Sequence, residues 1–392
     1  MELKKEYDVI VVGAGPGGCH CAKLLAEKGL DVLLIDRAQE IGVPKETAEG
    51  LSKRAERNLG IKIPDYCIAQ FIDGAWIYAP NGKMVEICCE GSEGYILEMK
   101  RFVKWMACEA SSAGAKVMAR SFAYDVVKDN DFVSGVRFRF MGNPYEVRSK
   151  VVVAADGVES LIAKRAGLDT SCSPVLVDSG FQYEMCNVEL EDEHKIEIFV
   201  GNEIAPRGYV WIFPKGRKTA NVGIGISGAN NVTTAKELLD RFILQRENLR
   251  KGSIVEVNGG CIPVGGFLKN MVTNGLVTIG DAAHQVNPLH GGGIAEAMYA
   301  ASIAARAIEK CFEKNDFSAG ALQEYNAMWW KERGEKLKMV EKGRELVEKL
   351  NDEQLNHLAE VLQGEDIEKI VHGDITKLIK VLVKFGIKQL VK

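Results

Sequence analysis

The fold is decided near the start of the chain, by residues 7–36, which read YDVIVVGAGPGGCHCAKLLAEKGLDVLLID. Four features follow one another along it, namely an apolar run, a glycine motif, a helical pattern and a second apolar run, at 9–12, 13–18, 19–28 and 32–35. In this strand–turn–helix–strand context, Gly13-x-Gly15-x-x-Gly18 predicts close backbone approach to a pyrophosphate at a helix N-terminus. Asp36, at the end of the second run, would accept hydrogen bonds from ribose hydroxyls. The stretch therefore predicts a Rossmann-like dinucleotide-binding unit, for NAD or for FAD.

The composition is that of an ordinary globular protein. Of the 392 residues, 46% are hydrophobic and 27% are charged, and the net charge of −4 argues against nucleic-acid binding through bulk charge. No apolar run is long enough to cross a bilayer, and no leader pattern precedes the first apolar run. The ten cysteines form no C-x-x-C pair, so we predict no metal site and no disulfide framework, and we expect a cytoplasmic protein.

A second glycine-rich stretch, at 275–294, reads GLVTIGDAAHQVNPLHGGGI. In it a short apolar run ends in Gly280-Asp281, and three glycines then open a long small-residue helix. Between the two stretches lies Asp156-Gly157. Three such motifs in this order resemble the FAD fold of p-hydroxybenzoate hydroxylase and glutathione reductase. The resemblance implies that Asp281 binds the ribityl hydroxyls of FAD and that the helix N-terminus stabilises the negative charge of reduced flavin.

A third motif lies in the segment 205–216, APRGYVWIFPKG. In a strand, Tyr209, Trp211 and Phe213 share one face, so they belong either to a buried core or to one wall of an apolar cavity. The pattern Y-x-W-x-F-P followed by G-x-G resembles the signature of the geranylgeranyl reductase family, and AEGLSK at 48–53 resembles that family's segment near the flavin. In that family the strand lines a tunnel for a polyprenyl chain. The resemblance therefore predicts substrate contacts for Tyr209, Trp211, Phe213, Pro214, Gly223 and Gly225.

The resemblance implies an FAD-dependent reductase that hydrogenates C=C bonds in the geranylgeranyl chains of archaeal ether lipids. Hydride would leave N5 of the reduced flavin for one alkene carbon, and a proton would reach the other. His290 and Tyr209 are the candidate catalytic proton donors, although a structural role is simpler for His290 and packing is simpler for Tyr209. The expected partners are a prenylated lipid and an external electron donor, either ferredoxin, NAD(P)H or another reduced flavin.

Two places depart from the pattern of the family. Glu46-Thr47 stand where the family has Arg-Cys, and Met99 stands where it has an Arg. These departures leave a non-catalytic flavoprotein electron carrier open. A flavin monooxygenase of the aromatic-hydroxylase type also stays open, because that fold has the same three FAD motifs, although the Y-x-W-x-F-P signature and Met99 count against it. Flavin reoxidation that depends on the alkene and needs no oxygen would separate the three classes.

The three motifs together predict an α/β (α+β) architecture. We expect a discontinuous Rossmann-like FAD-binding domain at 1–70, 95–170 and 260–315, an antiparallel-sheet substrate domain at 71–94 and 171–259, and a helical C-terminal region at 316–392. The residues that we predict to contact FAD come from several segments of the chain: Gly13, Gly15, Pro16, Gly17, Gly18, Asp36, Arg37, Thr47, Ala48, Gly50, Met99, Ala123, Asp156, Gly157, Gly280, Asp281, Gly292, Gly293 and Ile294.

The end of the chain, DITKLIKVLVKFGIKQLVK at 374–392, has the pattern of a basic amphipathic helix. Its lysines at 377, 380, 384 and 388 form one stripe, which predicts either peripheral contact with an anionic membrane through 375–392 or a helix packed on the body with a solvated lysine face.

Overall fold

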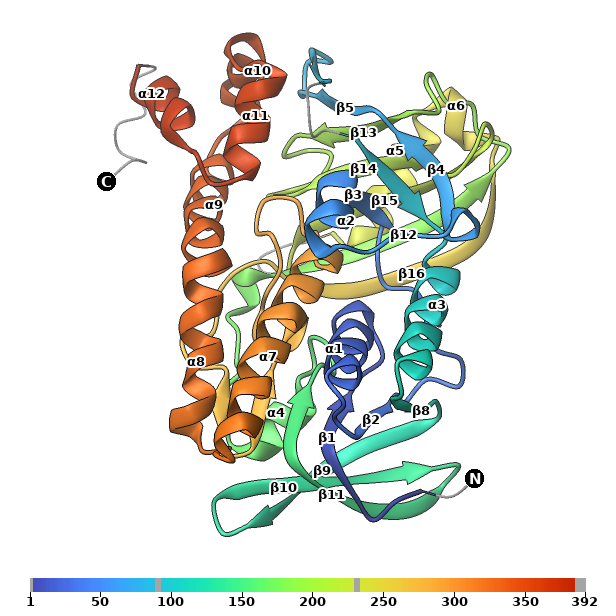
Figure 1. Ribbon diagram of the computed structural model, residues 1–392. Helices are drawn as coiled ribbons and strands as arrows, with labels where there is room; N and C mark the ends of the chain where they lie inside the picture. The colour runs from blue at the N-terminus through green and yellow to red at the C-terminus, as the bar shows by residue number, and fades with distance from the viewer. Residues whose placement is uncertain (1–2, 89–92, 229–232, 385–392) are drawn as a thin grey trace.

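The computed structural model describes residues 3–88, 93–228 and 233–384. Two large sheets lie one above the other in Figure 1, with helices between them and a column of C-terminal helices along one side. The chain passes between the sheets several times, so each sheet is assembled from segments that are far apart in the sequence.

The first sheet contains the predicted nucleotide-binding unit. Its strands are β1 (Glu6–Val12), β2 (Val32–Ile35), β8 (Lys116–Met118), β9 (Ser121–Asp129), β10 (Phe132–Phe140), β11 (Asn143–Ala154), β17 (Val272–Thr273) and β18 (Leu276–Thr278). Their order is β17-β18-β11-β1-β2-β8, and β9 and β10 continue antiparallel from β11. The pairs β18–β11, β11–β1, β1–β2 and β2–β8 are parallel, as expected for apolar strands that are covered on both faces.

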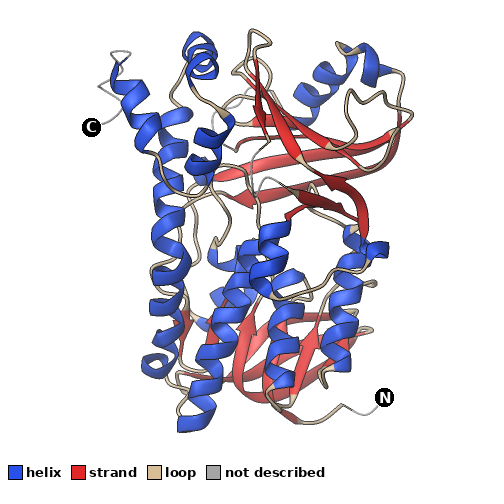
Figure 2. Ribbon diagram, turned by 45° about the horizontal axis from the view of Figure 1, so that its top comes forward, coloured by secondary structure: helices blue, strands red, loops and turns tan. Residues whose placement is uncertain are grey.

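Three helices pack on one face of this sheet, as Figure 2 shows: α1 (Pro16–Glu27), α3 (Met99–Ser112) and α7 (Ile294–Lys314). The helix α1 follows β1 directly, with Gly15 as its N-cap and Pro16 in its first turn, where the missing N–H of proline costs no hydrogen bond. Small residues of α7 are buried against α1, so the two helices approach each other closely. The Rossmann-like fold predicted from residues 7–36 is confirmed.

The second sheet has seven strands in the order β16-β12-β15-β14-β13-β5-β6. They are β5 (Gly74–Tyr78), β6 (Met84–Ile87), β12 (Val177–Cys186), β13 (Lys195–Val200), β14 (Tyr209–Pro214), β15 (Thr219–Ser227) and β16 (Ser253–Pro263). The sheet is antiparallel, as predicted, except that β13 and β5 run parallel. The helices α5 (Ala235–Leu244) and α6 (Glu247–Arg250) follow β15.

The alternation of side chains in β14 divides its residues between two environments. Val210 and Ile212 are buried in the apolar cluster that joins the sheet to α5. Tyr209, Trp211 and Phe213 point to the opposite face, which is turned toward the first sheet. Of the two alternatives for the three aromatic residues, the structure supports the cavity wall, and Val210 and Ile212 form the core face of the strand.

Smaller elements connect the two large sheets. A three-stranded sheet is formed by β3 (Gly50–Ser52), β7 (Gly94–Leu97) and β4 (Ile68–Ile72). The remaining short elements are α2 (Lys53–Leu59), α4 (Leu161–Ala166), η1 (Asp65–Cys67), η2 (Pro174–Leu176) and η3 (Gly280–Ala283).

The C-terminal region is helical, as predicted. The helix α8 (Ala319–Trp329), a π-helical turn η4 (Trp330–Gly334) and α9 (Glu335–Val347) follow one another without a break and run from the level of the first sheet toward the second (Figure 1). A side chain at Gly334 would meet the rings of Trp330 and Trp329, at 2.6 and 2.7 Å from its Cβ. The close approach of these two indoles therefore requires glycine at this turn.

Three further helices complete the region, α10 (Asp352–Val361), α11 (Gly364–Val371) and α12 (Thr376–Lys384). Leu378, Val381 and Leu382 of α12 are buried in an apolar cluster with α9, α10 and α11. For the described part of the tail this supports a packed helix, and Lys388 lies outside the described residues. Within the described ranges, no helix has both the length and the apolar character needed to cross a membrane.

Candidate functional site

A cavity of about 1200 Å³ lies between the two large sheets and the C-terminal helices. Every residue predicted to contact FAD lines it, and so do Tyr209, Trp211, Phe213 and His290. The predicted nucleotide end and the predicted substrate end therefore share one space. Pro214, Gly223 and Gly225 are not among the residues that line it, so the structure does not bring these three predicted substrate residues to the cavity.

Glycine is needed at the start of α1 for two different reasons, packing of the turn and access to the cavity. A Cβ on Gly13 would lie 2.1 Å from the carbonyl oxygen of Ala155, and one on Gly18 would lie 1.8 Å from that of Gly13. Packing of the turn requires both. Around Gly15, in contrast, no atom of the described residues beyond its two chain neighbours lies within 4 Å of such a Cβ, although Gly15 lines the cavity. Open space at this position fits a cradle for a pyrophosphate.

Asp36 lies beside the same cradle, and backbone groups fix its carboxylate. Oδ2 accepts a hydrogen bond from the N–H of Ala14, and Oδ1 accepts one from the N–H of Ala38, both at 2.7 Å. Each carboxylate oxygen has a second lone pair, which leaves capacity for ribose hydroxyls. Arg37 forms a 2.5 Å ion pair with Glu159 at this end of the cavity.

The pair Asp156-Gly157 follows β11 and holds a polar atom that protein groups leave unsatisfied. Oδ2 of Asp156 accepts a hydrogen bond from the N–H of Ile162 at 2.8 Å, whereas Oδ1 is buried without a partner among the described residues. Burial raises the pKa of this carboxyl group. A buried oxygen without a partner is costly, so a ligand donor at this position would relieve it.

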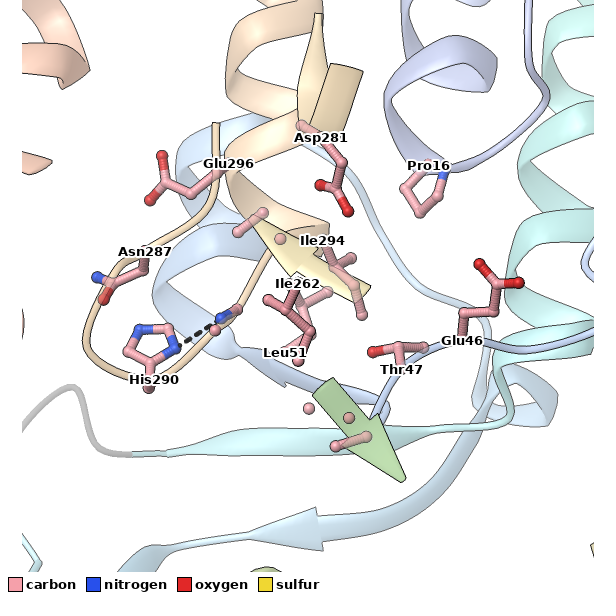
Figure 3. A pocket seen from close by; sticks show the side chains of 18 of the residues that line it. Pro16, Glu46, Thr47, Leu51, Ile262, Asp281, Asn287, His290, Ile294 and Glu296 are labelled. Carbon is pink, nitrogen blue, oxygen red and sulfur yellow. Dashed lines mark hydrogen bonds between the residues drawn. The ribbon is translucent and has the colours of Figure 1, made fainter. Parts of the chain in front are cut away.

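Asp281 projects into the cavity between β18 and α7, and Figure 3 shows it near Pro16 and Glu46. Burial raises its pKa to about 6, and the negative charge of Glu46 adds to the effect. A Cβ on Gly293 would lie 3.1 Å from Oδ1 of Asp281, so glycine at this position leaves room for the carboxylate. The N-terminus of α7 opens onto the same space through Ile294.

His290 holds the glycine loop that precedes α7. Its Nδ1 accepts a hydrogen bond from the N–H of Gly292 at 3.1 Å, which places the proton of the neutral ring on Nε2 (Figure 3). The ring is exposed to the cavity, and desolvation by the protein around the cavity lowers its pKa to about 4. His290 is therefore neutral at pH 7, which favours a structural role.

Tyr209 is tied to the same loop. Its hydroxyl donates a 2.7 Å hydrogen bond to the carbonyl oxygen of His290. Burial raises the pKa of this phenol, so Tyr209 keeps its proton at pH 7. The two candidate proton donors therefore touch each other through the backbone of residue 290.

The segment before β3, where the sequence departs from the family pattern, also lines the cavity. The carbonyl oxygen of Thr47 accepts a 3.3 Å hydrogen bond from the side chain of Gln182, whose Oε1 accepts one from Nε1 of Trp211 at 2.8 Å. A Cβ on Gly50 would lie 3.2 Å from the ring of Phe213. The predicted flavin segment and the aromatic wall are thus in direct contact.

Beneath this segment lies a buried network of charges that sequence reasoning missed. Nζ of Lys45 lies 3.0 Å from Glu49 and 2.5 Å from Glu184, and Nζ of Lys215 lies 2.9 Å from Glu49 and 3.1 Å from Glu184. Both lysine side chains are at most 3% exposed. The other oxygen of Glu49 accepts a 2.9 Å hydrogen bond from the N–H of Met99. The network joins the segment before β3, the start of α3 and the second sheet.

The far part of the cavity is apolar and was also missed. Ile196 and Ile198 of β13 line it from the sheet, and Leu358 of α10 and Leu378 of α12 line it from the C-terminal helices. The spacing of Leu355, Leu358 and Leu362 marks one face of a helix in the sequence, but it does not say what that face covers.

Three family models match parts of the chain. The geranylgeranyl reductase catalytic domain matches residues 177–262, which include β12 to β15 and most of β16. The NAD(P)-binding Rossmann-like domain matches residues 11–50, and the lycopene cyclase protein model matches residues 228–370.

Whole-chain similarity is found with proteins of archaea. The chain is 41% identical over 391 residues to the digeranylgeranylglycerophospholipid reductase of Methanocaldococcus jannaschii, with 98% of each chain covered. It is 40% identical to digeranylgeranylglycerophospholipid reductase 2 of Methanopyrus kandleri, with 97% of this chain and 96% of the relative covered.

Among solved structures, a geranylgeranyl bacteriochlorophyll reductase-like protein from Thermoplasma acidophilum matches with a TM-score of 0.92 and 34% identity, over 98% of this chain and 99% of that chain. The FAD-dependent myxobacterial chondrochloren halogenase matches with a TM-score of 0.71 and 21% identity, over 86% and 82% of the two chains. The second likeness shows the fold alone.

Proposed function

The chain belongs to the family of digeranylgeranylglycerophospholipid reductases, and from that premise we propose how its cavity carries out the reaction. The protein is an FAD-dependent oxidoreductase that hydrogenates C=C bonds in the geranylgeranyl chains of archaeal ether lipids. The observation that carries the proposal is the continuity of one cavity from the glycine cradle at Gly15 to the aromatic wall of β14 and the apolar far end.

The residues present at the nucleotide end fit FAD. The open space at Gly15 accommodates the pyrophosphate, and the fixed carboxylate of Asp36 accommodates the ribose. We expect Asp281 and the N-terminus of α7, which line the same cavity, to face the ribityl chain and the flavin ring. When bound and reduced, FAD supplies the hydride, from N5.

The second sheet orients the lipid and excludes water. An isolated alkene has no carbonyl group whose developing charge an oxyanion site could stabilise, so alignment and a dry environment must lower much of the barrier. Trp211 is suited to this because its ring lines the cavity while its only polar atom, Nε1, is satisfied by Gln182. Ile196 and Ile198 continue the apolar surface toward the C-terminal helices.

For the proton we favour Tyr209 over His290. Both residues line the cavity and carry a proton at pH 7, Tyr209 on the hydroxyl that donates to the carbonyl oxygen of His290, and His290 on Nε2, since Nδ1 accepts from Gly292. We favour the phenol because the N–H of a neutral imidazole is the weaker acid. The test compares Tyr209→Phe with His290→Asn. Loss of single-turnover lipid reduction in Tyr209→Phe, with retention in His290→Asn, supports the assignment, and the reverse pattern contradicts it.

The reaction itself is tested without oxygen. The protein is reduced with dithionite until the flavin bleaches, a geranylgeranyl glycerophospholipid is added in detergent, and flavin absorbance and lipid mass are followed. Return of oxidised flavin together with a hydrogenated lipid is the expected result. Reoxidation of the flavin only after oxygen is admitted would favour the flavin monooxygenase. A flavin absorbance that does not respond to the alkene would favour the electron carrier.

We propose that the electrons come from an external donor, and the three candidate classes can be compared directly. Ferredoxin, NAD(P)H and reduced free flavin are each mixed with the oxidised protein in the absence of oxygen, and the rate of flavin bleaching is measured. We expect the physiological electron donor to belong to the class that reduces the flavin faster than the protein turns over the lipid.

For membrane contact we propose attraction by charge, since the apolar face of α12 is already buried against α9, α10 and α11. Lys380 and Lys384 are exposed on that helix and form no ion pair with a described residue. Changing both to Glu should reduce sedimentation with anionic vesicles and leave the behaviour with neutral vesicles unchanged. Equal sedimentation of wild type and variant with anionic vesicles would overturn this part of the proposal.

A further inference from the structure

One side of the cavity is basic, in contrast to its apolar walls. Four basic residues line it there, from three parts of the chain: Arg54 of α2, Arg333 of η4, Lys336 of α9 and His372 after α11. The acidic side chains beside them are Glu296 and Glu368. Figure 3 shows Glu296 on this side of the cavity, near Asn287, whose side chain donates a 3.1 Å hydrogen bond to the carbonyl of Val371.

Two of the basic side chains are held in place by partners. Nη1 of Arg54 lies 2.8 Å from Nε2 of His372, and Nη2 lies 3.2 Å from Glu368. Arg333 forms a two-pronged ion pair with Glu296, and its guanidinium lies 4.5 Å from the centre of the ring of Tyr299. Guanidinium groups fixed in this way are preorganised for a planar or tetrahedral oxyanion.

The third cation, Lys336, is not neutralised. It is exposed at the cavity, and it forms no ion pair with any residue in the described ranges. Glu296 and Glu368 balance Arg333 and Arg54, so one positive charge is left over. Consistent with a positive field, the pKa of His372 is lowered, first by burial and then by the charge of Arg54, with Arg333 and Lys336 acting in the same direction and Glu368 opposing them.

From this geometry we propose that Arg54, Arg333 and Lys336 bind the phosphate ester of the lipid headgroup, while the prenyl chains extend from there into the apolar part of the cavity. The inference rests on the proposed function and deepens it. An amphiphile fits the arrangement because Leu358 and Ile370, which line the same cavity, belong to one apolar cluster, and Ile370 lies two residues before His372. The phosphate neutralises the surplus charge at Lys336.

The test uses Lys336→Gln with Lys342→Gln as its matched control. Both lysines are exposed on α9 and unpaired among the described residues, but only Lys336 lines the cavity. Turnover is measured with dithionite as the only reductant, so that no phosphate-bearing nucleotide is added as electron donor. The substrates are di-geranylgeranylglyceryl phosphate and neutral di-geranylgeranylglycerol.

We expect Lys336→Gln to raise KM for the phosphate-bearing lipid by about three- to five-fold, the range of a solvent-accessible ion pair, with kcat unchanged. KM for the neutral lipid should not change, and Lys342→Gln should behave like wild type with both. An equal shift with both lipids, or no shift with the phosphate-bearing lipid, would overturn the proposal.

Inorganic phosphate distinguishes a headgroup from a free anion. A headgroup site predicts that phosphate competes with the phosphate-bearing lipid and leaves turnover of the neutral lipid unaltered. A change in neutral-lipid turnover would instead assign the site to a free phosphate. If wild type reduces neither lipid, the proposed function fails, and quenching of tryptophan fluorescence by the two lipids in both variants still decides whether Lys336 contacts the phosphate.

Discussion

The indole of Trp211 covers Gly223 so closely that no side chain fits between them: a Cβ on Gly223 would lie 2.3 Å from Cζ2 of the ring. The two residues face each other across the pair β14–β15. The glycine is therefore needed to let the indole lie down on the sheet and face the cavity with its other side.

Gly223→Ala should displace Trp211 and break its hydrogen bond to Gln182, because overpacking a fixed ring costs about 1–3 kcal/mol. We expect a higher KM for the lipid with FAD content unchanged. Gly225→Ala is the matched control, since its Cβ would lie 3.7 Å from Trp211, an ordinary contact. Equal impairment of lipid turnover in both variants would contradict this account.

Gly15→Val should yield a folded protein that does not retain FAD. In the described part of the chain, nothing beyond the two neighbouring residues lies within 4 Å of a Cβ at this position, so we expect a bound ligand to exclude the side chain. Flavin absorbance of the purified variant, before and after incubation with FAD, measures the effect, and circular dichroism checks the fold. A normal flavin content would show that the pyrophosphate lies elsewhere.

The affinity for FAD should rise with pH between about 5 and 7 and then level off. Burial and Glu46 raise the pKa of Asp281 to about 6, and the ionised carboxylate accepts hydrogen bonds from hydroxyl groups better than the protonated one. Binding therefore favours the ionised form, and affinity falls as pH drops through this pKa. In Asp281→Asn the dependence should disappear over this interval in a fluorescence titration, and an unchanged slope would assign it to another group.

Lys215→Met should destabilise the protein by about 3 kcal/mol, the scale for removing one member of a buried ion network. Burial alone would lower the pKa of Lys215, but the carboxylates of Glu49, Glu184 and Glu98 outweigh it and raise the pKa. In the variant, Lys45 is the one cation that Glu49 and Glu184 still share among the described residues. Urea unfolding measures the difference between Lys215→Met and Lys218→Met, the second at an exposed neighbour that forms no ion pair with a described residue. Equal stabilities would contradict the role of the network.

The nucleotide end could be predicted from the sequence because its signals are local. The turn at Gly13 and Gly18 and the acid at position 36 lie within one strand–turn–helix–strand stretch, and the structure shows this order as β1, the turn, α1 and β2, with Asp36 directly after β2. The aromatic wall could be predicted because side chains alternate between the two faces of a strand, so the sequence shows which residues share a face.

Which neighbouring residue a glycine makes room for could not be predicted in the same way. Gly223 and Gly225 were expected to contact the substrate, but they lie behind the wall, where Gly223 makes room for Trp211. The signature indicates that small residues are needed at these positions and does not indicate which neighbour needs the space. Pro214 likewise ends β14 and is buried away from the cavity.

Contacts between distant segments were out of reach of pattern reasoning. Lys45 and Lys215 share their carboxylates across the boundary of the two sheets, and Arg54 meets His372 between α2 and the end of α11. Each of these residues looks like an ordinary surface charge in the sequence. Only the fold shows that two of them are buried and that the other two line the cavity.

The apolar far wall has a consequence for how this family could diversify. Leu358 and Leu378 line the cavity yet belong to the C-terminal apolar cluster, which is separate from the clusters that hold the nucleotide end. The side chains of the C-terminal helices that line the cavity can therefore change in size without disturbing the clusters at the nucleotide end. Smaller or larger side chains at these two positions would reset how many isoprene units fit, while the redox chemistry at the other end stays as it is.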